Sequence, residues 1–214
     1  MAISSFVRRT AAVGAVAIAL SAAAAGQAHA SAHRTPPVTH FLEKQGMYVG
    51  GFDAAVAKAH GYKIVTYANG DQQAVPVNSK SGLPKGPLLV KASARKGGVS
   101  PDNSSGDTVY GDCGYSWIAG EQTGTHQIEL SSGFGVDDAA VEYSWTVQLS
   151  DENGTSTHHA SGTLALDSSW SDEWTGLNQY DYSIDEALTS SYAIMDDGSV
   201  CYSGGPYMVL TGLG

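Results

Sequence analysis

The nine residues "VEYSWTVQL" (141–149) indicate the fold class more clearly than any other stretch of the chain. Apolar side chains occupy every second position and polar ones lie between them, which is the alternation of a β-strand with one buried face. The face predicted to point into the core consists of Val141, Tyr143, Trp145, Val147 and Leu149. We therefore expect a strand of an antiparallel sheet that covers the core with one face.

Further short segments with strand character follow Thr108, separated by turn residues such as Asp196-Asp197-Gly198. These segments are 109–119, 126–130, 162–167, 180–184, 191–195, 200–203 and 207–210. Their predicted inward side chains include Val109, Cys113, Tyr115, Trp117, Ile128, Leu130, Leu164, Leu166, Tyr180, Tyr182 and Ile184. About eight strands at regular spacing, with no helix between them, predict an all-β domain over residues 108–214, an antiparallel β-sandwich.

A small segment of different character, residues 31–77, precedes this domain. Asp53 is suited to cap the start of a short helix that stops at Gly61. An Asn69-Gly70 turn between two β-like runs then predicts a hairpin. The fold class is thus completed by a small N-terminal helix plus β-hairpin extension. It is too small for a core of its own, so we expect it to pack on the main domain or to be a pro-segment or arm.

Residues 78–107 read as a linker because they are rich in Gly, Ser and Pro and basic in their first part. Within this linker, the apolar patch 88–90 is suited to dock as an edge strand.

The first thirty residues, 1–30, are predicted to be a signal peptide. Arg8 and Arg9 precede a small-residue apolar run, and Ala28-His29-Ala30 fits a cleavage site. The rival interpretation is a membrane anchor, but the run is shorter than the roughly 20 apolar residues that a span needs. We therefore expect a secreted, extracellular protein without membrane insertion.

Two cysteines, Cys113 and Cys201, are present in the whole chain. In an oxidising compartment two cysteines most simply form one disulfide, which would join opposite ends of the predicted β domain. The alternative is two free buried thiols. The spacing matches no zinc motif.

The charges divide the chain into two parts. All 11 Lys and Arg residues lie at or before Lys96, whereas the 118 residues from Gly97 onward carry 18 Asp and Glu. Such a region is unsuited to nucleic acid, because phosphates are bound by Lys and Arg. The partner classes that remain are a neutral glycan, a cation or a basic protein. In the alternative interpretation, the charge serves only to keep the domain soluble.

The stretch "SSWSDEWTG" (168–176) is the best candidate for ligand binding. If it is extended, Trp170, Asp172 and Trp174 share one face, and two indoles with a carboxylate between them suit a sugar surface. Their loss would then weaken binding and leave stability nearly unchanged. The alternative is a loop whose tryptophans fold back over the core.

Catalytic and metal motifs are weak. The chain has no Gly-x-Ser-x-Gly elbow and no His-Glu-x-x-His motif, so no catalytic residue is assigned. Adjacent His158 and His159 are expected on opposite strand faces, as a solvated pair. We expect no cofactor, but calcium stays open because carboxylates gather in predicted turns. These turns are at 137–138, 151–153 and 196–197.

The chain also resembles exported actinobacterial proteins of unassigned function. The resemblance rests on the Ala-rich leader, "FDAAVAKAHGYKI" (52–64) ahead of the linker, and "YGDCG" (110–114). It implies no activity. The function expected from the sequence is secreted, non-catalytic binding, with neutral carbohydrate or envelope glycan as the ligand. A secreted hydrolase that acts through carboxylates and a structural or self-assembling extracellular protein are the alternatives.

Overall fold

The computed structural model describes residues 40–90, 111–180 and 182–213. The predicted signal peptide and most of the predicted linker, residues 91–107, lie outside these ranges, as does Val109.

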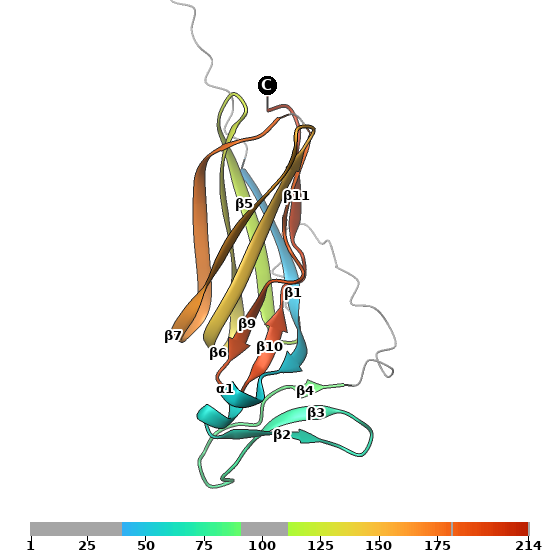
Figure 1. Cartoon of the computed structure of the whole chain (residues 1–214), viewed down its shortest axis with the longest axis vertical. Helices are drawn as coiled ribbons and strands as arrows, with labels where there is room; N and C mark the ends of the chain where they lie inside the picture. The colour runs from blue at the N-terminus through green and yellow to red at the C-terminus, as the bar shows by residue number, and fades with distance from the viewer. Residues whose placement is uncertain (1–39, 91–110, 181, 214) are drawn as a thin grey trace, which may run out of the picture. The chain divides into compact units, whose positions relative to one another are not determined.

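The described chain is an antiparallel β-sandwich built on one eight-stranded sheet (Figure 1). The order of strands is β11-β8-β6-β5-β1-β10-β9, with β7 paired to β6. Because β9 also pairs with β6, the path from β6 through β5, β1, β10 and β9 closes on itself. The strands are β1 (His40–Phe52), β5 (Gly114–Gly124), β6 (Gln127–Asp151), β7 (Gly154–Asn178), β8 (Ser183–Ala187), β9 (Tyr192–Met195), β10 (Ser199–Tyr202) and β11 (Tyr207–Leu210).

Two long strands, β6 and β7, lie side by side (Figure 1). The register of β6 against β7 shifts between Gly135 and Ala140. Before this shift β6 pairs with β5, and after it β6 pairs with β9 and then β8. We call residues 154–166 of β7 the hairpin limb, because they follow the β6–β7 turn, and residues 167–178 the return limb.

The core confirms the strand predicted at 141–149. Trp145, Val147 and Leu149 are buried, and Val141 and Tyr143 of the same face are partly buried. The indole N–H of Trp145 donates to Ser132 Oγ at 3.0 Å, so this fully buried polar atom is satisfied. The predicted inward positions Ile128 and Leu130 are also buried.

The predicted face of β5 is wrong. Gly114, Ser116, Ile118 and Gly120 point inward, and Tyr115 and Trp117 lie partly exposed on the other face. Gly114 has φ +139°, and a Cβ added to it would lie 2.2 Å from the carbonyl oxygen of Gly135. This glycine breaks the alternation, so Cys113 is buried although the odd-numbered residues after it are not.

The predicted face of β8 is wrong as well. Ser183, Asp185 and Ala187 are buried, whereas Tyr182 and Ile184 are 68% and 41% exposed. The register with β11 explains the difference, because Asp185 pairs with Met208 and Ser183 with Leu210, and both partners are buried. Leu166 of β7, also expected inside, is exposed and has a positive φ of 64°.

The N-terminal extension has the predicted helix and hairpin. Helix α1 (Ala54–Ala59) is capped by Asp53, whose carboxylate accepts from the N–H groups of Ala55 and Val56 at 2.8 and 2.9 Å. A second sheet follows, with β2 (Tyr62–Thr66), β3 (Gln72–Pro76) and β4 (Leu88–Leu89). The Asp53 N–H donates to the Gly198 carbonyl at 2.7 Å, so the extension packs on the β9–β10 turn.

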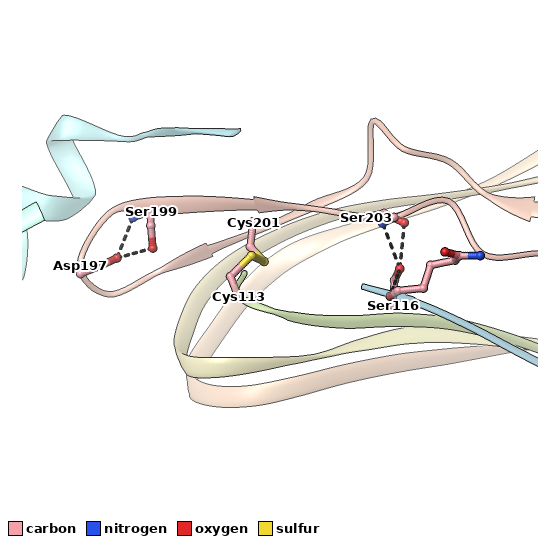
Figure 2. The surroundings of a disulfide bond; sticks show 8 residues. Cys113, Ser116, Asp197, Ser199, Cys201 and Ser203 are labelled. Carbon is pink, nitrogen blue, oxygen red and sulfur yellow. Dashed lines mark hydrogen bonds between the residues drawn. A yellow bond between two sulfur atoms is a disulfide. The ribbon is translucent and has the colours of Figure 1, made fainter. Parts of the chain in front are cut away.

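The predicted disulfide between Cys113 and Cys201 is present, with a Cα–Cα distance of 6.2 Å (Figure 2). Both cysteines are buried, and the bridge ties the residue before β5 to β10. A short hydrogen-bond chain lies beside it. Ser203 Oγ donates to Ser116 Oγ at 3.3 Å, and the Gly204 N–H donates to the same oxygen at 3.1 Å.

Candidate binding pocket

The three residues singled out in the sequence all lie on the return limb of β7. Trp170, Asp172 and Trp174 pair with Phe134, Ser132 and Leu130 of β6, whose side chains are buried. Paired residues of an antiparallel sheet point to the same face, so the three side chains do share one face, and it is the inner one. Both indoles are half-buried there, and Asp172 is exposed.

Trp170 is part of an aromatic cluster. Its ring stacks on Tyr143 with 4.4 Å between centroids, and the rings of Phe134 and Trp145 lie at 6.1 Å. Trp174 is less enclosed, and its ring contact is with His158 at 5.7 Å. Trp170 therefore packs against the core. This differs from the predicted exposed face, on which both indoles would contact a sugar.

Trp170→Ala should consequently lower the free energy of unfolding by about 2–4 kcal/mol, because it leaves a void next to Tyr143 and Phe134. Urea denaturation measures this loss. Trp117→Ala is the matched control, since that half-buried indole lies on the outward face of β5 and should cost clearly less. Equal losses at the two positions would contradict a packing role for Trp170.

A pocket of about 250 Å³ lies at the end of the sandwich where the β6–β7 hairpin meets the end of β7. The lining residues carry one aromatic ring, a carboxylate, three side-chain amides and two aliphatic hydroxyls, and they include Leu149 and Gly154. The polar and aromatic residues are Asp151, Asn153, Thr155, Ser156, Asn178, Gln179 and Tyr180. No cationic side chain belongs to this lining.

Asp151 fixes the rim of the pocket. Its two carboxylate oxygens accept from the N–H of Asn153 at 2.8 Å and from the N–H of Tyr180 at 3.1 Å. The carboxylate thus holds the hairpin turn and the segment after β7 together. The Tyr180 ring, 41% exposed, packs on the ring of His126 with 4.9 Å between centroids.

The floor of the pocket is a buried polar network. Gln179 donates through Nε2 to Asp185 Oδ1 and accepts from Ser183 Oγ at 3.0 Å. The Gln179 N–H donates to the His126 carbonyl at 2.9 Å. These bonds use both ends of the Gln179 amide, so its position is fixed from below.

Asp185 is the unusual member of this network. Its side chain is fully buried, and Oδ2 has no hydrogen-bond partner. Burial raises the pKa of Asp185 to about 7, the negative charge of Asp151 adds to the increase, and the hydrogen bond from Gln179 opposes it.

The three predicted turns, all within the described residues, do not bring three acidic, His or Cys side chains to one point. Within residues 40–90, 111–180 and 182–213, no group of three His, Cys, Asp or Glu side chains is arranged to hold a metal ion. Residues 137–138 lie within strand β6 and not in the predicted turn. They do lie beside the turn at 196–197, because burial raises the pKa of Asp138 and the carboxylates of Asp197 and Asp196 raise it further. However, the Oδ2 of Asp197, which has no hydrogen-bond partner, lies so close to Gly86 that a Cβ on Gly86 would collide with it.

The pocket does not follow from the sequence for two reasons. The sequence pattern predicts Tyr180 on an inward strand face, whereas it lies before β8 with its ring on the surface. Asp151 and Asn153 were recognised as turn residues, but the partner segment 178–180 lies far along the chain. Nothing local in the sequence indicates that the two segments meet.

What this arrangement offers chemically is hydrogen bonding beside an aromatic face. The described residues contain no helix that is long and apolar enough to cross a membrane. No protein-family model matches the chain, and no curated protein or solved structure matches it either.

Proposed function

We propose that this is an exported, non-catalytic binding protein and that its ligand is a neutral carbohydrate held in the pocket beside Tyr180. The observation that carries the proposal is one exposed aromatic ring placed next to a carboxylate and uncharged amides, with no cation in the lining. Sugars are bound in this way because a ring covers their C–H face and polar groups meet their hydroxyls.

The pocket is also pre-organised, which favours binding by reducing the entropy lost on association. Asp151 holds both sides of the rim, and Gln179 is fixed by the network below. Because the ligand is neutral, affinity should depend little on ionic strength, in contrast to binding of a basic protein by acidic residues.

The tryptophan row is a second candidate contact within the same proposal. Asp172 is exposed and each indole keeps some exposed surface, so a glycan chain has access to this side of the sandwich. Hydrolysis receives less support. The carboxyl with the strongly raised pKa, Asp185, has no exposed surface and lies outside the pocket lining, so a substrate does not reach it in this conformation.

The test is binding of the mature protein to a panel of neutral soluble and insoluble polysaccharides, by pull-down and calorimetry. Tyr180→Ala and Asn178→Ala should each weaken binding about tenfold or more, because each removes a direct ligand contact. Tyr207→Ala is the matched control, since it removes an exposed tyrosine from β11, away from the pocket lining.

A second pair of variants distinguishes the pocket beside Tyr180 from the tryptophan row as the place where the glycan binds. If the tryptophan row binds the glycan, Asp172→Asn should weaken binding while Glu173→Gln, the neighbouring carboxylate on the opposite face, does not. Failure of the wild-type protein to bind any neutral glycan would overturn the proposal.

A further inference from the structure

Within the part of the chain that the structure describes, the hairpin limb of β7 is a free sheet edge. Among the described residues β7 pairs with β6 alone, so its other edge has no neighbouring strand. Every second residue of an antiparallel strand turns its N–H and C=O toward that open edge. The limb therefore presents a row of backbone donors and acceptors with which another strand can pair.

This edge is unusually regular. From Thr163 opposite Glu142 to Gly154 opposite Asp151 the register with β6 continues without a shift. The 13 residues 154–166, "GTSTHHASGTLAL", contain no Asp, Glu, Lys, Arg or Pro, although the 118 residues from Gly97 carry 18 acids. Proteins commonly protect a free edge with charges, proline or a bulge, and the paired part of this limb has none of these.

We propose that a second copy of this chain pairs with this edge, strand to antiparallel strand, about a two-fold axis at Ala160. The interaction goes beyond carbohydrate binding, since it uses the backbone of the hairpin limb. A two-fold pairing satisfies the same edge in both copies and closes at the dimer.

The pattern of backbone groups is consistent with this axis. Glu152 and Asn153 form a two-residue turn, so Asp151 and Gly154 beside it are a hydrogen-bonded pair. Counting on from Gly154, the even-numbered residues bond to β6 and the odd-numbered ones face the open edge. An axis at Ala160 then places His159 opposite Ser161 of the second copy, and both turn their backbone groups toward each other.

Charge favours an uncharged strand, such as the limb of a second copy, over an acidic one. The region is strongly acidic, so a partner strand that carries Asp or Glu is repelled, whereas the limb of a second copy is uncharged. The remaining acids, including exposed Asp167, Asp172 and Glu173 of the return limb, still repel each other between copies. Association should therefore strengthen as salt screens this repulsion.

Cross-linking tests the axis. In the proposed dimer Ala160 lies opposite its own counterpart in a non-hydrogen-bonded pair, where Cβ atoms are about 4.5–5.5 Å apart. Ala160→Cys should thus form an intermolecular disulfide under mild oxidation. Ala165→Cys is the control, because residue 165 lies opposite residue 155 of the second copy and should cross-link several-fold more slowly. Equal rates for the two variants would overturn the proposed register.

Sedimentation velocity of the unmodified mature protein tests the dimer itself. We expect monomer and dimer in exchange, with the dimer fraction rising between about 0.05 and 0.5 M NaCl. Ser161→Glu should raise the dissociation constant about tenfold or more, because it places a carboxylate at the edge of both copies. Ser171→Glu, the same exposed change on the return limb, should have less effect. A wild-type protein that stays monomeric up to about 1 mM at high salt refutes the proposal, whatever its glycan binding.

Discussion

Removing the Cys113–Cys201 disulfide should lower the free energy of unfolding by about 4–5 kcal/mol, because the bridge restricts a long loop in the unfolded chain. The two cysteines are separated by 88 positions, and the restriction of the unfolded chain grows with that separation. The Cα–Cα distance of 6.2 Å lies in the ordinary range, so Cys113 and Cys201 form the bridge without displacement of the backbone. The loss should therefore approach the chain-entropy value.

The variant to measure is the double substitution Cys113→Ala and Cys201→Ala, by urea denaturation. The wild-type protein unfolded in the presence of a reductant is the matched control, and it should lose a similar amount. Thiol titration of the denatured, unreduced protein should find no free thiol. A double variant that loses less than about 1 kcal/mol would show that the bridge does not restrict the unfolded chain as argued.

The strands that could be predicted are those in which apolar and polar side chains alternate, as they do in a sheet with one buried face. The segment 141–149 alternates cleanly, and its inward positions Trp145, Val147 and Leu149 are buried. The Asn69-Gly70 turn and the Asp53 cap were predictable because both depend on local backbone chemistry. The disulfide followed from the number of cysteines and the expected compartment.

Strand β1 could not be predicted, because its burial does not follow apolar character. The apolar side chains Met47 and Val49 are buried, but Gln45 is buried beside them and Leu42 is 59% exposed. Lys44, on the outer face, lies 5.1 Å from the centre of the Tyr115 ring. A strand that mixes polar and apolar side chains on both faces has no period for sequence analysis to detect.

The candidate pocket could not be predicted because its two sides come from segments far apart in the chain. Residues 151–156 and 178–180 meet when β7 runs its full length and returns to the hairpin end. The reversed face of β8 has a related cause. Its position between β6 and β11 directs Asp185 inward, and the sequence pattern favoured Ile184 instead.

Asp185→Asn should stabilise the protein at alkaline pH, and the physical reason is the buried carboxyl itself. Its pKa is raised to about 7 in the folded state, against about 3.9 in the unfolded chain. The folded state therefore binds the proton more tightly. The contribution of the protonated Asp185 carboxyl to the free energy of unfolding is fully present below about pH 4 and is lost as the pH rises toward and through 7. A difference of about 3 pKa units corresponds to about 4 kcal/mol lost above pH 8.

Asparagine reproduces the protonated acid at this site. Its carbonyl oxygen can accept the hydrogen bond from Gln179, and its amide nitrogen replaces Oδ2, which has no partner in the native network. The variant should match the wild type within about 1 kcal/mol at pH 4–5 and exceed it by about 2–4 kcal/mol at pH 8.5.

The measurement is the free energy of unfolding from urea denaturation at several pH values between 4 and about 9. Asp167→Asn is the matched control, since this carboxylate is exposed and its removal should leave the pH profile of the wild type unchanged. The difference between the two variants isolates the contribution of Asp185 from those of the other titratable groups. If Asp185→Asn is destabilising at pH 8.5 and its pH profile is parallel to that of the wild type, Asp185 is ionised in the folded protein. The network with Gln179 and Ser183 must then stabilise a charge at this position.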